Sequence, residues 1–262
     1  MTEVFPMVVD LSHWDPAYDY GKVLDSGIFG CIYKATEGDG YTDPTYVDQQ
    51  RMAKSAGLLW GAYHFANAEP ISKQIDNFLR FACPDPDELF CLDWEDYGSN
   101  TMSLSNVKTW MKEVEDALGR EGQCVLYSGN TAKEALGDSV DDFLGERRLW
   151  LCQYGDTPVW QKSWDRYWLW QYTDGVYGPA PHSINGIGPC DINSFERSSD
   201  DLMAEWATGT IGPEPTPTPT FDTVNVLITA PPGVTVKVRQ LSRTQDVKPL
   251  REKEGGHYRH RK

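Results

Sequence analysis

Short apolar runs that alternate with helix-like stretches are the feature of this sequence that most restricts its fold. Eight runs have the length of a strand: 4–11, 28–35, 58–65, 89–94, 124–127, 149–154, 167–172 and 187–192. Helix-like segments lie between or after several of them, at about 44–57, 72–82, 103–120 and 131–144. Continuous apolar strands that alternate with helices predict a parallel sheet covered by helices. Eight such strands favour an α/β fold closed into an irregular TIM-like barrel, because the connections after the fifth strand are too short for full helices.

A Pro/Thr-rich segment marks the clearest boundary in the chain. Residues 210–220 alternate proline with threonine, a composition typical of an extended, semi-rigid linker. The boundary predicts a barrel domain over residues 1–209 and a small β-rich or partly disordered tail over 221–262. About 42 residues is marginal for an independent fold.

Charge divides the chain in the same way. Residues 209–262 hold nine Lys/Arg and five Asp/Glu, a net charge of +4, so the total of −15 leaves −19 for residues 1–208. An acidic body argues against nucleic acid as the partner, since phosphates would be repelled. It suits a neutral sugar polymer, and 10 Trp and 13 Tyr supply flat faces on which sugar rings stack.

Cysteine usage and the N-terminus bear on the compartment. The six cysteines form no C-x-x-C pair, and four of them lie in apolar runs, as expected of buried thiols in a reducing cytoplasm. The first residues lack the basic and apolar regions of a secretory signal, and no apolar stretch approaches the ~20 residues of a membrane span. We therefore expect synthesis in a cytoplasm and no membrane insertion.

Polar residues follow nearly every predicted strand, where a barrel of parallel strands has its active site. Asp93 and Glu95 stand at the end of the fourth run. Because side chains alternate along a strand, both should face the barrel mouth while Trp94 packs against the helices. Their Cα atoms should lie about 6.5–7 Å apart, so repulsion and partial burial should separate their pKa values. One carboxyl group can then donate a proton while the other stays ionised, which is what glycoside cleavage needs. A lone D-x-E is common by chance, but Asp10 and Asp191 at two other strand ends favour the functional interpretation.

In these motifs the sequence resembles the glycoside hydrolase family 25 lysozymes, the Chalaropsis-type muramidases, over roughly residues 4–207. The resemblance rests on an ordered series of segments: 9–14 (VDLSHW), 34–38 (KATEG), 61–65 (GAYHF), Asp93-x-Glu95, Tyr127-Ser128, 170–172 (WQY) and Asp191-x-Asn193.

The resemblance implies a (β/α)5β3 barrel that hydrolyses the β-1,4 bond between N-acetylmuramic acid and N-acetylglucosamine of bacterial peptidoglycan, without a cofactor or metal. It implies Glu95 as the general acid and Asp93 as an assisting carboxylate that orients the 2-acetamido group or activates water. Asp10 and Asp191 match the family's two further acidic positions. We expect the substrate-binding residues to be Tyr63, Tyr127, Glu37, Gln171, Trp170 and Asn193, with Glu37 equally suited to a structural hydrogen bond.

The absence of a secretory signal predicts a phage endolysin or a virion-borne lysin that reaches the wall after release. In that case the basic tail would have a natural role in binding anionic wall polymers.

Two other functions remain open on the sequence alone. A metal-dependent phosphodiesterase could use Asp10, Glu37, Asp93, Glu95 and two histidines, His13 and His64, as ligands, although only Lys34 is near a strand end to meet a phosphate. A wall-binding protein without activity could keep the same body for adhesion. His13 and His64 better suit orienting or packing roles, and the Pro/Gly-rich stretch 175–187 suits an inert excursion slightly better than a groove wall.

Overall fold

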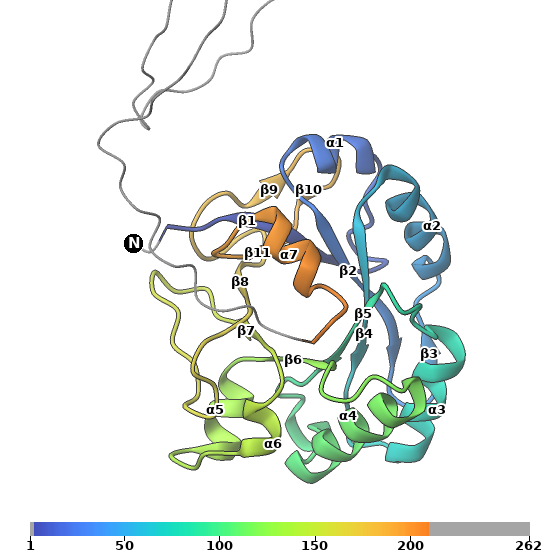
Figure 1. Ribbon diagram of the computed structural model, residues 1–262, viewed down its shortest axis with the longest axis vertical. Coiled ribbons are helices and arrows are strands. Elements are labelled where there is room, and N and C mark those ends of the chain that lie inside the picture. The colour runs from blue at the N-terminus through green and yellow to red at the C-terminus, as the bar shows by residue number, and fades with distance from the viewer. Residues whose placement is uncertain (1–2, 210–262) are drawn as a thin grey trace, which may run out of the picture. The chain divides into compact units, whose positions relative to one another are not determined.

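The computed structural model describes residues 3–209, and these fold into a closed eight-stranded barrel with helices around it (Figure 1). The first seven barrel strands pair in parallel, each with the next. The eighth strand pairs with both the seventh and the first, which closes the sheet into a barrel. The predicted eight-stranded α/β barrel is therefore confirmed. The barrel strands are β1 (Pro6–Leu11), β2 (Gly30–Glu37), β4 (Leu59–Phe65), β5 (Leu89–Asp93), β6 (Val125–Ser128), β7 (Leu149–Cys152), β8 (Leu169–Thr173) and β11 (Asp191–Ser194).

The eighth barrel strand differs from the sequence-based expectation. β11 runs antiparallel to both neighbours, β1 and β8, and it begins at Asp191 instead of ending there. No helix carries the chain from β8 back to the opposite end of the barrel. A short hairpin of β9 (Ser183–Ile184) and β10 (Gly188–Pro189) intervenes instead, so the chain re-enters the barrel from the rim it had just left. Asp191 still reaches that rim, where its Cα pairs with that of Asp10.

The helices follow the apolar periodicity of the sequence most closely in the first half of the chain. The predicted segment 131–144 forms two short helices instead of one, separated by Gly137 at a φ of +53°. At α4, Ser103 accepts a hydrogen bond from Asn106 N as its N-cap, and Gly119 in the left-handed region ends the helix. The helices are α1 (Tyr20–Asp25), α2 (Tyr46–Ala56), α3 (Ile71–Phe81), the 3-10 turn η1 (Gly98–Asn100), α4 (Leu104–Leu118), α5 (Asn130–Leu136), α6 (Asp142–Gly145) and α7 (Ser199–Glu205).

Strand alternation separates two apolar cores. On β5, Leu89 and Cys91 face the barrel interior, whereas Phe90 and Leu92 belong to the core between the strands and the helices. The next inward position is Asp93, which confirms the expected parity. Trp94 faces outward and is buried, with its indole N–H donating to Met102 O at 2.9 Å.

Helix α7 closes the end of the barrel opposite the carboxyl-terminal rim. Trp206, directly after the helix, lies in the interior core, and its indole N–H donates to Trp60 O at 2.8 Å. A Cβ added to Gly30 would meet the Trp206 ring at 2.6 Å, so glycine is needed there to admit the indole. The buried Arg148 side chain donates to the carbonyl oxygens of Glu205 and Trp206 and thereby anchors the helix end.

Other sequence-based predictions concern the cysteines, membrane-spanning helices and the C-terminal tail. All six cysteines are free thiols, and four are buried. Within residues 3–209 there is no helix with the length and apolar character that crossing a membrane requires. A two-residue strand, β3 (Tyr41–Thr42), pairs antiparallel with the end of β2. The predicted linker 210–220 and tail 221–262 lie outside the described residues.

Candidate active site

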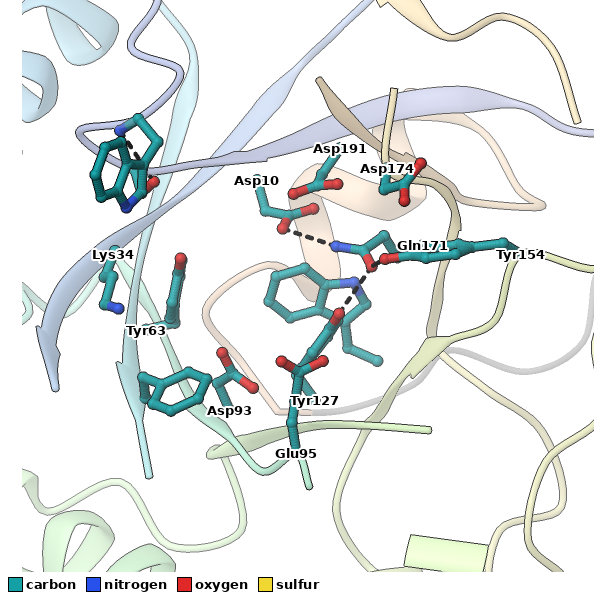
Figure 2. A pocket seen from close by; sticks show the side chains of 14 residues that line it. Asp10, Lys34, Tyr63, Asp93, Glu95, Tyr127, Tyr154, Gln171, Asp174 and Asp191 are labelled. Carbon is teal, nitrogen blue, oxygen red and sulfur yellow. Dashed lines mark hydrogen bonds between the residues drawn. The ribbon is translucent and has the colours of Figure 1, made fainter. Parts of the chain in front are cut away.

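A pocket of about 330 Å³ opens at the carboxyl-terminal ends of the parallel strands (Figure 2). It contains all four carboxyl groups that the sequence assigned to the active site, and also Tyr63, Tyr127 and Gln171. These residues come from β1, β4, β5, β6, β8 and β11, so the barrel gathers positions separated by up to 181 residues in the chain. The lining residues are Asp10, Ser12, Trp14, Lys34, Tyr63, Phe65, Asp93, Glu95, Tyr127, Trp150, Tyr154, Gln171, Asp174 and Asp191.

Asp93 and Glu95 enter the pocket from the same strand end. Asp93 is the last residue of β5 and is only 7% exposed, whereas Glu95 lies two residues further out and is partly exposed. Burial and the neighbouring Glu95 raise the pKa of Asp93 well above its usual range. Burial also raises the pKa of Glu95, while the Tyr127 hydroxyl and the Lys34 ammonium act to lower it. The two carboxyl groups therefore form an interacting pair that retains a proton above the usual carboxyl range.

One oxygen of Asp93 has a special position. Its Oδ1 is buried, and none of the residues that the structure describes offers it a hydrogen bond. An unpartnered buried carboxylate oxygen costs free energy unless a donor reaches it. The pocket therefore contains an acceptor that a ligand N–H or O–H can satisfy.

Asp10 and Asp191 form a second acidic pair across the rim. Their Cα atoms are register partners of β1 and β11, and Figure 2 shows the two carboxyl groups next to each other. Burial raises the pKa of Asp10 to about 7, although hydrogen bonds from Asn193 and Gln171 oppose the shift. Burial and the charge of Asp10 raise the pKa of Asp191 to about 9. At neutral pH this pair holds at least one proton, which limits the repulsion within the pocket.

Gln171 connects the acidic residues to two tyrosines. Its Nε2 donates to Asp10 Oδ2 at 2.8 Å, and its Oε1 accepts the hydroxyl protons of Tyr127 and Tyr154, each at 2.8 Å (Figure 2). These three bonds fix which way the amide faces, because only the nitrogen can donate and only the oxygen can accept twice. The network holds Tyr127, and through it the surroundings of Glu95, in one arrangement.

A cation lies on the other side of the pocket. The Lys34 ammonium forms an ion pair with Glu37 and lies 4.9 Å from the Phe65 ring centroid. Its charge lowers the pKa of both Asp93 and Glu95 relative to burial alone. Figure 2 shows Lys34 and Tyr63 on the side of the pocket away from Tyr154 and Asp174.

Three of the predicted substrate-binding residues do not line the pocket. Trp170 is fully buried in the outer core, because it neighbours Gln171 on β8 and adjacent strand residues point to opposite faces. Asn193 is buried below the pocket and donates to Asp10 Oδ1 at 2.7 Å, so it positions that carboxyl group instead of meeting a ligand. Glu37 pairs with Lys34, which matches the structural alternative.

Seven lining residues were not assigned from the sequence: Ser12, Trp14, Lys34, Phe65, Trp150, Tyr154 and Asp174. Trp14 and Lys34 stand inside the quoted motifs, and Lys34 was noted only as the one base near a strand end. Tyr154 follows β7, and Asp174 follows β8 at the start of the Pro/Gly-rich stretch. Polar residues directly after a strand are the common pattern, and it would have indicated Asp174.

The histidines have structural partners. His64 is buried, and its two ring nitrogens lie at hydrogen-bond distance from Thr36 and Gln74. The ring and backbone nitrogens of His13 both contact Asp43. Among residues 3–209 no group of three His, Cys, Asp or Glu side chains has the geometry to hold a metal ion.

Comparison with known proteins gives one family. The model of the family described as "Glycosyl hydrolases family 25" matches residues 9–179. An autolytic lysozyme of Clostridium acetobutylicum is 29% identical over 194 residues, which cover 72% of this chain and 55% of the relative. This chain thus spans little more than half the length of that protein. An N,O-diacetylmuramidase of Chalaropsis is 26% identical over 197 residues, covering 68% of this chain and 92% of the relative.

The fold has counterparts among solved structures. A bacterial lysozyme from Streptomyces coelicolor superposes with a TM-score of 0.67 at 24% identity, over 80% of this chain and all of that chain. At this identity the likeness shows a shared fold.

Proposed function

The chain belongs to glycosyl hydrolases family 25, and from that premise we propose that it is a lysozyme which hydrolyses the β-1,4 bond between N-acetylmuramic acid and N-acetylglucosamine in peptidoglycan. The observation that carries the proposal is the pair Asp93 and Glu95. They enter one pocket from one strand end, and both have raised pKa values.

Glu95 is the proposed general acid. It is the more exposed member of the pair, so it can reach the oxygen between two sugars. Burial raises its pKa, so it retains its proton to a higher pH than an exposed glutamate does. The proton passes to the leaving oxygen as the bond from that oxygen to C1 of the muramic acid residue breaks.

Asp93 is the proposed partner of the 2-acetamido group. Its unpartnered Oδ1 accepts the acetamido N–H, and this contact orients the acetamido carbonyl oxygen toward C1. That oxygen forms a bond to C1 as the leaving group departs, and a cyclic oxazolinium ion results. Water then attacks C1, ionised Glu95 takes the proton of the water, and the acetamido group is restored. Two displacements at C1 retain its configuration.

Asp10 and Asp191 are proposed to act electrostatically and to hold the sugar. With a pKa of about 9, Asp191 is protonated at neutral pH and can donate to a sugar oxygen, while Asp10 accepts from Gln171 and Asn193. Tyr63 and Tyr127 line the same pocket and are proposed to contact the sugar at the cleaved bond.

Reducing-end analysis of digested cell walls tests the function. Wild-type protein should release new reducing sugars, with muramic acid at the reducing end by mass spectrometry. Glu95→Gln should lower the rate by about two to four orders of magnitude, the range expected on loss of a general acid. Glu121→Gln removes an exposed glutamate and serves as the matched control. Full activity in Glu95→Gln would overturn the assignment.

The other functions are less well supported. Family membership does not favour a metal-dependent phosphodiesterase or a wall-binding protein without activity. Activity that survives EDTA would exclude the former. Release by a phage and binding of anionic wall polymers by the basic tail stay predictions, and deletion of 210–262 with wall binding measured across salt concentrations tests the second of them.

A further inference from the structure

A continuous row of rings extends from the pocket along the rim of the barrel. The Trp14 ring lies 4.5 Å from that of His13, which lies 6.0 Å from Tyr41; Phe65 lies 5.6 Å from Tyr97 (centroid distances). The Lys34 ammonium joins the two halves, at 5.5 Å from the Tyr41 centroid and 4.9 Å from the Phe65 centroid. We call this surface the aromatic ridge, and its members are Trp14, His13, Tyr41, Lys34, Phe65 and Tyr97.

The ridge is exposed although it is aromatic. Trp14 is 84% exposed and Tyr97 is 48% exposed, while Tyr41 is 38% exposed. Large apolar side chains that gather at the surface without covering a core mark a binding surface more often than single exposed residues do. The position of the ridge indicates the ligand, because Trp14, Lys34 and Phe65 also line the catalytic pocket.

Hydrogen-bonded turns hold the backbone at both ends of the ridge. On one side, Ser12 N donates to Asp15 Oδ1 and Trp14 N donates to Ser12 Oγ. On the other side, Tyr97 N donates to Thr101 Oγ1 at 2.7 Å. Between them, Asp43 contacts both the backbone nitrogen and the ring of His13. The backbone that carries the ridge is therefore already in place, which reduces the conformational entropy lost on binding.

We propose that the aromatic ridge binds sugar rings of the glycan strand beyond the residues held in the pocket, on the Lys34 side of the cleaved bond. This inference rests on the proposed function. Sugar rings present an apolar face that stacks on an aromatic ring and hydroxyl edges that bond to polar groups. The ridge offers both, since its rings alternate with the Lys34 ammonium and the His13 imidazole.

The ridge predicts that longer glycan strands are better substrates. The measured quantity is the ratio of kcat/KM for long, peptide-free glycan strands to kcat/KM for a tetrasaccharide of two repeats. Removal of the stem peptides leaves only sugars to contact the ridge. Tyr97→Ala and Tyr41→Ala, made in the full chain, should each lower this ratio by about threefold to tenfold, mainly through KM for the long strands.

Two further variants serve as controls. Tyr97→Phe keeps the ring and should keep the wild-type ratio. Tyr18→Ala removes a more exposed tyrosine, 65% exposed, that lies near helix α1 and outside the ridge, and should also leave the ratio unchanged. Melting temperatures close to wild type would show that the variants are folded.

The result that overturns the proposal is an unchanged ratio in both folded alanine variants. A dimer that dissociates in Tyr97→Ala, with the ratio unchanged, would assign the ridge to a second copy of this chain and would overturn the proposal as well. If the wild-type protein hydrolyses neither substrate, the proposed function fails. The ridge is then judged by calorimetric binding of the long strands, which Tyr97→Ala should weaken by the same factor.

Discussion

The positive charge of the Lys34 ammonium lowers the pKa values of Asp93 and Glu95, which burial raises. Lys34→Met keeps an unbranched apolar stem but removes the charge. The pKa of both carboxyl groups should then rise. The acidic limb of the pH profile reports ionisation of one group and the basic limb reports deprotonation of the other, so both limbs should move to higher pH. Rates of wall hydrolysis across pH measure the shift.

The matched control is Lys162→Met. Lys162 is an exposed lysine that interacts with Asp138 and does not line the pocket. Its profile should coincide with that of the wild type. A Lys34→Met profile that keeps both limbs in place would show that Lys34 does not act on the pair electrostatically.

At Asp93 the unpartnered oxygen gives a stereochemical prediction. If Asp93 orients the acetamido group, the first product seen by NMR is the β anomer, because two displacements retain configuration. Asp93→Asn should lower kcat by about two to four orders of magnitude, since the amide weakens orientation of the reacting group. Asp156→Asn, at an exposed position, is the control. An α anomer as the first product would show instead that a carboxylate activates water directly.

At the scale of elements, helix α7 should contribute a large share of barrel stability. Trp206 fills the closed end of the barrel, and its indole N–H reaches the backbone of β4 at Trp60. Trp206→Ala leaves a cavity between strands that cannot collapse, so the free energy of unfolding should fall by about 3–5 kcal/mol. Met203→Ala, at a half-exposed position on the same helix, should change it by about 0.5 kcal/mol or less. Urea titration followed by circular dichroism measures both, and a loss below about 1 kcal/mol for Trp206→Ala would contradict this role of α7.

The elements also show how far the sequence alone could lead. The apolar runs predicted seven barrel strands closely and the eighth only at Asp191 and Ile192. Alternation along β5 predicted which side of the strand Asp93 occupies. The direction of β11 was not predictable from periodicity, because direction depends on whether the preceding connection crosses the barrel. Helix α7 is short. Its stabilising effect comes from Trp206, which contacts β2 and β4 at positions far away in the sequence.

The pocket was predictable only where local sequence patterns identify its residues. Carboxyl groups at strand ends could be identified one strand at a time, and the barrel brings them together. Trp170 does not line the pocket, and the alternation rule could have indicated this, since Gln171 beside it faces inward. Tyr154 lies beyond the end of β7, in a segment whose path depends on the whole barrel, and no local pattern indicates that it reaches Gln171.

For the whole molecule, the four carboxyl groups of the pocket make stability depend on pH. Their pKa values are raised on folding, to about 7 for Asp10 and about 9 for Asp191. The folded state therefore binds more protons than the unfolded state between about pH 4 and pH 9. Stability from these groups is complete below the unfolded pKa of 3.8, and it is lost as the pH rises through the folded values. The free energy of unfolding should fall steadily across this window.

Asp191→Asn tests this dependence, because an amide cannot ionise. At pH 9 the variant should be more stable than the wild type by more than about 1 kcal/mol, and at pH 4 the two should be nearly equal. Asp87→Asn makes the same change in net charge at an exposed site, so it separates the effect of the pocket from the general repulsion of a chain with net charge −15. Urea titrations at both pH values give the comparison. If Asp191→Asn were no more stable than Asp87→Asn at pH 9, ionisation of Asp191 would not limit the stability of the fold. If the difference appears together with a loss of wall hydrolysis, the acidic pocket is retained for activity at the expense of stability, which is the relation expected for catalytic groups held in an unfavourable ionisation state.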